Sequence, residues 1–261
     1  MPASFLDLHR RGDPLLMPNP WDAGSAVLLA SLGFQALATT SSGFAATMGR
    51  RDYGVTREEA LAHSAAIAAA TALPVSADLE NGFADDPAGV AETVRGAIDA
   101  GLAGCSIEDH TGRAEDPIYE RGLAAERVAA AVEAAGSELV ITARCENLLH
   151  GRPFDDTIAR LQAYQEAGAH VLFAPGVVEA QDIRAIVGSV DRPVNVLALP
   201  QAPPVRELAG LGVARVSVGG AFAFAALGAV VEAARELREE GTYGYWRLAG
   251  AGSKAARAAF R

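Results

Sequence analysis

Short apolar runs alternate with longer amphipathic segments along almost the whole chain, and this alternation limits the fold more than any other feature. Segments with helical spacing, such as 57–70 and 124–135, separate the apolar runs. Strands that alternate with helices predict βαβ units and a parallel sheet. Because the runs are apolar throughout, both faces of that sheet are expected to be covered. The runs lie at 15–18, 36–40, 74–78, 104–108, 139–144, 170–175, 193–199 and 215–219.

The number of strand-like runs and the length of the chain favour a closed barrel. Gly33, Gly101 and Gly168 each precede such a run at nearly equal spacing, which is weak support for an internal repeat. A chain of 261 residues is of ordinary size for one (β/α)₈ barrel. We therefore predict a single α/β barrel domain over 1–261, with 241–261 as a tail that packs on the barrel or on a neighbouring subunit. An open, doubly wound sheet is the alternative.

The charge of the chain restricts what it can bind. The net charge is −10 and the sequence has a single lysine, Lys254, so nothing in it resembles the basic face of a nucleic-acid-binding protein. An anionic substrate must therefore be held by arginine, by backbone N–H groups or by a metal. Cys105 and Cys145 lie in apolar runs and are expected to be buried thiols. Without a signal pattern or a long apolar stretch, a cytoplasmic protein without a membrane partner is expected.

Carboxylates follow several of the strand-like runs. Asp78, Glu108 and Glu146 each stand at or just after the end of a run, and Glu80 shares a strand face with Asp78. Since active sites of barrels lie at the carboxyl ends of the strands, these side chains are expected to meet. Like charges placed together need a cation, and Mg²⁺ prefers oxygen ligands. The alternative is a solvated rim whose carboxylates cap the following helices.

Two further features of the strand ends suggest an anion site. Arg144 ends an apolar run, where an arginine is rarely placed without a partner, so it is expected to bind a substrate carboxylate or to pair with Glu146. Thr40, Ser41 and Ser42 form a polar turn whose N–H and hydroxyl groups suit a carboxylate. An ordinary helix-capping turn is the alternative for these three residues.

Five segments together resemble the isocitrate lyase / phosphoenolpyruvate mutase superfamily. The stretch 76–82 is similar to its Asp-x-Asp-x-Gly metal motif, with Glu80 in place of the second aspartate. The stretch 49–52 resembles the aspartate turn after the second strand of the family. The other matches, in family order, are 19–26, 106–109 and 142–146.

This resemblance implies an enzyme that stabilises an enolate-type oxyanion with Mg²⁺, or with Mn²⁺ in its place, on a small 2-oxo or 2-hydroxy carboxylate. It also implies a barrel whose last helix is exchanged between subunits of a homo-oligomer, usually a tetramer. By the resemblance, Asp78 is the nearest metal ligand, and Asp52, Glu80 and Glu108 act mostly through water. The residues predicted to bind the substrate carboxylate are Arg144, Thr40, Ser41 and Ser42. The predicted catalytic residues are Arg144, Glu108 and His110.

The loop 110–119 departs from the family pattern. It has neither the catalytic cysteine of the lyases nor the lysine and asparagine of the phosphonopyruvate enzymes, and Ala221 stands where the oxaloacetate decarboxylases have a histidine. A C–C lyase or decarboxylase is the first hypothesis. A phosphonate-type mutase or hydrolase, or a non-catalytic carboxylate-binding barrel, are the alternatives. The segment 110–123 is predicted to be a mobile lid with hinges at Gly112 and Gly122.

Overall fold

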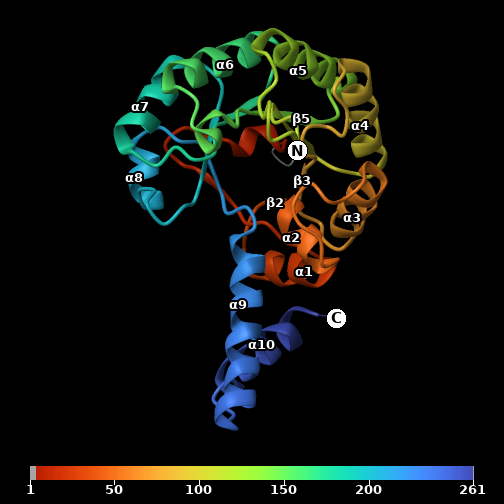
Figure 1. The fold of residues 1–261 in the computed structure, drawn as a ribbon, viewed down its shortest axis with the longest axis vertical. Helices are drawn as coiled ribbons and strands as arrows, with labels where there is room; N and C mark the ends of the chain where they lie inside the picture. The colour runs from red at the N-terminus through yellow and green to blue at the C-terminus, as the bar shows by residue number, and fades with distance from the viewer. Residues whose placement is uncertain (1–3, 261) are drawn as a thin grey trace.

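A computed structural model describes residues 4–260 and has eight parallel strands in one sheet, in the order β1-β8-β7-β6-β5-β4-β3-β2. Helices surround this sheet on its outer side (Figure 1). The predicted (β/α)₈ barrel is therefore confirmed, and the open sheet is wrong. The strands are β1 (Leu15–Met17), β2 (Leu37–Ala38), β3 (Val75–Asp78), β4 (Gly104–Glu108), β5 (Val140–Arg144), β6 (Val171–Phe173), β7 (Val194–Leu197) and β8 (Arg215–Ser217).

The helices follow the strands as the amphipathic segments predict. Several begin with a side-chain cap: Asp22 caps α1 and Thr56 caps α3, each in a reciprocal capping box. The helices are α1 (Ala23–Ser31), α2 (Ser41–Thr47), α3 (Arg57–Ala69), α4 (Pro87–Asp99), α5 (Arg121–Ala135), α6 (Phe154–Glu166), α7 (Ala180–Ser189), α8 (Val205–Gly210), α9 (Ala221–Arg235) and α10 (Trp246–Ala259). Shorter turns are η1 (Leu6–Leu8), η2 (Asn147–His150) and the π-helical η3 (Glu236–Glu240).

The barrel is closed between β1 and β2 by side-chain and loop hydrogen bonds instead of a strand ladder. The Ala38 N–H donates to the Pro18 carbonyl at 3.1 Å. Asn19 Nδ2 donates to the Thr39 carbonyl at 2.8 Å, and its Oδ1 accepts two backbone N–H groups that follow β8, each at 3.0 Å. Asn19 therefore joins three strand ends at the rim where a site is expected.

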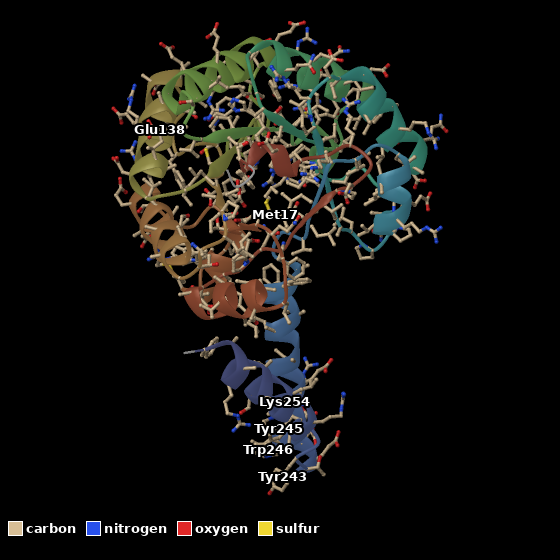
Figure 2. All side chains as sticks on the ribbon, turned by 180° about the vertical axis from the view of Figure 1, so that it is seen from behind. Met17, Glu138, Tyr243, Tyr245, Trp246 and Lys254 are labelled. Carbon is tan, nitrogen blue, oxygen red and sulfur yellow. The ribbon has the colours of Figure 1, made fainter. Side chains whose placement is uncertain are left out.

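The last two helices project away from the barrel (Figure 1). Apolar side chains of α9 stay exposed, with Phe224 51% and Val230 63% accessible, and Trp246 at the distal end is 66% accessible (Figure 2). On the barrel itself, Leu16 of β1 is 41% accessible although the outer face of a barrel strand is normally covered by a helix. The α10 helix contacts α1. Within residues 4–260, no helix is long and apolar enough to cross a membrane.

The loop between β4 and α5 is anchored at its base. The Thr111 N–H donates to the Pro117 carbonyl at 2.8 Å, and the Tyr119 N–H donates to the Asp109 carbonyl at 2.9 Å. Tyr119 is buried, and the Arg127 guanidinium lies 4.0 Å from its ring centre. Only the tip, 112–116, is exposed throughout. The predicted hinge residue Gly122 lies in the first turn of α5, and its role as a hinge stays a prediction.

Candidate active site

A cavity of about 190 Å³ opens at the carboxyl ends of the strands. It lies there because parallel strands bring all their carboxyl ends to one rim, where the loops leave room above the packed interior. Its lining is largely polar, and Met17, Phe173 and Leu197 are among its apolar residues. The predicted residues that line it are Thr40, Ser41, Ser42, Asp52, Asp78 and Arg144.

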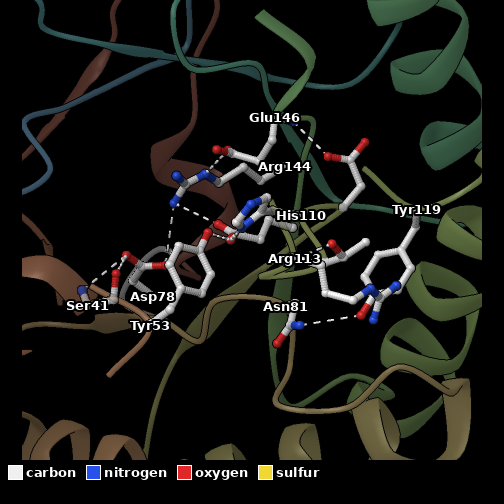
Figure 3. Close-up of polar contacts among 12 residues, drawn as sticks. Ser41, Tyr53, Asp78, Asn81, His110, Arg113, Tyr119, Arg144 and Glu146 are labelled. Atoms are coloured by element: carbon white, nitrogen blue, oxygen red, sulfur yellow. Dashed lines mark hydrogen bonds and ion pairs between the residues drawn. The ribbon is translucent and has the colours of Figure 1, made fainter. Parts of the chain in front are cut away.

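Asp78, the last residue of β3, is held by hydrogen bonds to its side chain and to its backbone N–H. Its Oδ2 accepts hydrogen bonds from the Ser41 N–H at 3.2 Å and from the Ser41 hydroxyl at 3.0 Å (Figure 3). Its own N–H donates to Thr39 Oγ1 at 2.9 Å. These contacts fix one carboxylate oxygen and leave Oδ1 facing Arg144, whose Nη1 is 3.6 Å away.

Arg144 is the cation among the carboxylates of this site. Its Nη1 lies 3.1 Å from Glu108 Oε2, and its Nε donates to Glu146 (Figure 3). Burial alone would lower the pKa of Arg144, but Glu108, Glu146 and Asp78 raise it well above its usual value. In this arrangement Nη1 and Nε of the guanidinium contact protein carboxylates, whereas Nη2 has no hydrogen-bond or ion-pair partner among residues 4–260. A cation that took over those carboxylates would free the other N–H groups for a substrate anion.

The site holds more negative charge than Arg144 neutralises. Burial, followed by the charges of Asp78 and Asp52, raises the pKa of Glu80 to about 8. Burial and Asp78 raise the pKa of Asp52, and burial raises that of Glu108. Glu80 Oε1 is buried without a hydrogen-bond partner among residues 4–260. Crowded, desolvated carboxylates with an unsatisfied oxygen fit a divalent cation.

The spacing of these carboxylates restricts how such a cation is held. In the part of the chain that the structure describes, no three His, Cys, Asp or Glu side chains are arranged to ligate a metal together. An ion here would complete its shell with water and substrate oxygen, which is usual for Mg²⁺ and unusual for a structural zinc site. The residues present therefore fit Mg²⁺ better than a closed metal centre.

Backbone strain is concentrated beside the carboxylates. Tyr53 and Glu80 adopt positive φ values of 59° and 49°, which non-glycine residues rarely do. Tyr53 follows Asp52, and its hydroxyl donates to Glu108 Oε1 (Figure 3). Strain of this kind persists where the surrounding structure holds a residue in place, and it is often found at functional sites. Tyr53 had no signal of its own in the sequence.

His110 does not line the cavity. Its ring stacks on His150 with centroids 4.7 Å apart, and its Nδ1 is 3.9 Å from Glu108 Oε1. Burial, followed by the charges of His150 and Arg144, lowers the pKa of His110, so the ring is neutral at pH 7. The residue lies next to Glu108 instead of in the cavity, and any part in proton transfer would run through that carboxylate.

The polar turn at the start of α2 serves partly as a helix cap. Thr40 Oγ1 accepts the Gly43 N–H at 3.3 Å, as the helix-capping alternative predicts. The Ser41 N–H is taken by Asp78, and Ser42 Oγ lies 3.2 Å from Thr40 Oγ1. All three predicted residues of the turn still line the cavity.

Three residues of the cavity floor escaped the sequence analysis: Asn195, Arg215 and Ser217. Arg215 lies in an apolar strand, the same signal that singled out Arg144, but it stands at the amino end of its strand. Because barrel sites lie at the carboxyl ends of the strands, an arginine at the amino end is not indicated as a site residue by the sequence pattern.

Comparison with known proteins places this site in a family. A family model described as phosphoenolpyruvate phosphomutase matches residues 5–238. The chain belongs to this family. The resemblance to the isocitrate lyase / phosphoenolpyruvate mutase superfamily is therefore confirmed.

Relatives within the family differ in the reaction they are named for. The chain is 33% identical over 192 residues to the 2-methylisocitrate lyase of Escherichia coli strain K12, covering 70% of this chain and 64% of that enzyme. A crystal structure of a candidate lyase/mutase from Burkholderia cenocepacia J2315 matches with a TM-score of 0.92 and 53% identity, over 97% of this chain and 93% of that one. A phosphonopyruvate hydrolase in complex with oxalate and Mg²⁺ matches with a TM-score of 0.80 and 26% identity, over 88% and 84% of the two chains.

Proposed function

We propose that this protein is a Mg²⁺-dependent enzyme that acts on a small 2-oxo or 2-hydroxy carboxylate, as a C–C bond lyase or decarboxylase. The observation that carries this proposal is the group of three carboxylates around Arg144, of which Asp78 lines the cavity together with Arg144. Lyases are among the relatives in the family, and a related hydrolase binds oxalate, a small dianion, together with Mg²⁺.

The carboxylates divide the work of holding the cation. Asp78 is the proposed nearest ligand, because it lines the cavity and its position is fixed by Ser41. Asp52, Glu80 and Glu108 are proposed to act through water, since no three acidic side chains within 4–260 are arranged to ligate one metal ion together. When bound, Mg²⁺ supplies Lewis acidity that stabilises an enolate oxygen. Mn²⁺ prefers similar oxygen ligands and is an alternative.

Arg144 is the proposed anchor for the substrate carboxylate. Its fork of N–H groups matches the geometry of a carboxylate, and its contacts with Asp78 and Glu108 keep it aimed at the cation site. Ser41 and Ser42, which line the same wall, are proposed to position the substrate beside it. The substrate would thus lie between the acidic group and the polar turn at the start of α2.

Proton transfer is proposed to involve Glu108. Burial raises its pKa, which makes it a stronger base than an exposed glutamate, and the Tyr53 hydroxyl donates to its Oε1. His110 Nδ1 lies 3.9 Å from the same oxygen, and its ring contacts the ring of Tyr53. This trio would take over the role of the cysteine that the loop 110–119 lacks.

A phosphonate mutase or hydrolase is the second candidate, favoured by the description of the family model and by the phosphonopyruvate hydrolase structure. A panel of 2-oxo and 2-hydroxy di- and tricarboxylates, with phosphonopyruvate, tested with and without Mg²⁺, separates the candidates. Turnover of a carboxylate that requires Mg²⁺ supports the proposal. Turnover of phosphonopyruvate alone supports the second candidate. No turnover by the wild type would support a non-catalytic binding protein.

The projecting helix α9 is proposed to complete the barrel of a neighbouring subunit. Its apolar face is uncovered within the described chain, while β1 of the same barrel has an uncovered outer residue, Leu16. An exchange of α9 between two copies would cover both surfaces at once. The tail that ends in α10 would then lie near the interface of a dimer or tetramer.

A further inference from the structure

The floor of the cavity contains a second buried arginine whose surroundings differ from those of Arg144. Arg215 is 3% accessible and lines the cavity. Its Nε donates to Asn195 Oδ1 at 3.0 Å, and its Nη1 donates to Thr142 Oγ1 at 3.1 Å. The remaining partner of Nη1 is His9 Nε2, at 3.3 Å. None of the three partners is a carboxylate.

The histidine beneath Arg215 is neutral and cannot compensate the charge. His9 Nδ1 lies 3.0 Å from the Phe5 carbonyl, which only accepts, so Nδ1 carries the proton and Nε2 accepts from Arg215. Burial, followed by the charge of Arg215, lowers the pKa of His9 to about 3. The network under the floor therefore orients the guanidinium without neutralising it.

The charge of Arg215 is consequently uncompensated in a desolvated place. No carboxylate in the described chain lies within ion-pair distance of it, whereas Arg144 contacts three. Burial lowers the pKa of Arg215 to about 9, so it is still a cation at pH 7. A buried charge without a partner is costly, and such a group binds an incoming anion strongly.

Arg215 and Ser217 each have a hydrogen-bond donor that no protein group within 4–260 uses. Nη2 of Arg215 has no acceptor among residues 4–260. It is not fully enclosed by these residues, so it can reach a ligand. Ser217 Oγ accepts from Asn195 Nδ2 at 2.9 Å, which leaves its own O–H to donate. Arg215 and Ser217 both line the cavity and thus present donors to the same space.

We infer that Arg215 and Ser217 form an anion subsite that binds the distal carboxylate of a dicarboxylic substrate. The inference rests on the proposed function, because it assumes that the 2-oxo or 2-hydroxy end of the substrate occupies the Arg144 side of the same cavity. It adds the substrate class: a small diacid with one carboxylate at the acidic rim and the other on the floor. Asn195 is a positioning residue that orients both donors.

Matched ligand pairs test the subsite. Malate and 2-hydroxybutanoate have four carbons each, 2-oxoglutarate and 2-oxopentanoate have five, and within each pair a carboxylate replaces a methyl group. Affinities are measured by calorimetry in the presence of Mg²⁺, on wild type and on Arg215→Met and Asn195→Asp. The second variant is nearly isosteric and gives Arg215 an internal carboxylate, so it keeps the buried charge paired if Arg215→Met does not fold.

We expect wild type to prefer the diacid of at least one pair by about tenfold or more, as a charge-assisted hydrogen bond to a buried donor provides. Both variants should lose this preference. No preference in wild type, or an undiminished preference in folded Asn195→Asp, would overturn the subsite.

Oxalate separates this inference from the proposed function, because its two carboxylates are adjacent and it cannot span from the rim to the floor. Unchanged Mg²⁺-dependent oxalate binding in the variants, with loss of the diacid preference, is the expected result. If wild type fails to bind oxalate but keeps an Arg215-dependent preference for a diacid, the proposed function fails and the subsite stands. If wild type binds oxalate and neither diacid, the subsite alone is rejected.

Discussion

Replacing Arg144 by methionine should show how far one guanidinium compensates the acidic group. The methylene stem of the arginine is retained in shape, while the charge next to Asp78, Glu108 and Glu146 is removed. Breaking a buried ion pair on one side costs about 3–5 kcal/mol. Because the Arg144 side chain keeps 18% of its surface accessible to the cavity, we expect the lower end, about 3 kcal/mol of unfolding free energy at pH 8.

The loss should depend on pH in a defined direction. Burial already raises the pKa of Glu108 and Glu146, and without Arg144 both are raised further in the folded state. At these two groups the folded variant then binds more protons than the unfolded chain, so their contribution to stability is greatest below about pH 4.3 and falls as the pH rises through their folded-state pKa values. The stability difference from wild type should therefore shrink from pH 8 to pH 5.5.

Urea unfolding at these two pH values measures the difference, with Arg152→Met as a control, since Arg152 is exposed and makes no ion pair within residues 4–260. Added Mg²⁺ should restore part of the stability of Arg144→Met, because the cation replaces the missing charge. A loss below about 1 kcal/mol, the range of an exposed ion pair, or a loss equal at both pH values, would refute the electrostatic reasoning.

Four further outcomes are expected. Asp78→Asn should abolish Mg²⁺ binding by calorimetry and leave the melting temperature within a few degrees of wild type, with the exposed Asp99→Asn as control. Arg144→Lys should weaken Mg²⁺-dependent oxalate binding by about tenfold or more, because lysine cannot form the two-pronged contact. Limited proteolysis should cut within 112–116, and Mg²⁺ with oxalate should slow this cleavage. Val230→Asp should shift the oligomer measured by light scattering toward the monomer, since it charges the exposed apolar face of α9.

Each of these outcomes has a result that would count against it. Mg²⁺ affinity retained in Asp78→Asn removes that residue from the ligands. Equal oxalate affinity in Arg144→Lys means that charge alone is needed. If Mg²⁺ with oxalate does not change the cleavage rate at 112–116, this loop is not a lid. An unchanged oligomer in Val230→Asp means that α9 is not the interface.

The site divides into a part that sequence reasoning found and a part that it missed. Asp78 and Arg144 were found because a charged residue at the end of an apolar strand has few explanations, and both line the cavity. Arg215 and Asn195 were missed although they line it as well. Their side chains reach the cavity from below, and the register that aligns β7 with β8 is not visible in a one-dimensional pattern.

His110 illustrates a different limit. The sequence places it two residues after Glu108, and both were predicted to be catalytic, yet the structure stacks its ring on His150 and leaves it out of the cavity lining. Residues i and i+2 of a strand share a face, but β4 ends at Glu108, so the loop and not the strand sets the direction of the His110 side chain.

The sequence by itself determined the barrel and the acidic rim, because both depend on local order: apolar runs of strand length, helical segments between them, and charged residues where the strands end. Only the tertiary structure decided which arginine is neutralised by protein carboxylates. Arg144 is surrounded by carboxylates from three different segments, and Arg215 by neutral groups from three others. A Coulomb interaction depends on distance in space and on burial, neither of which follows from separation along the chain.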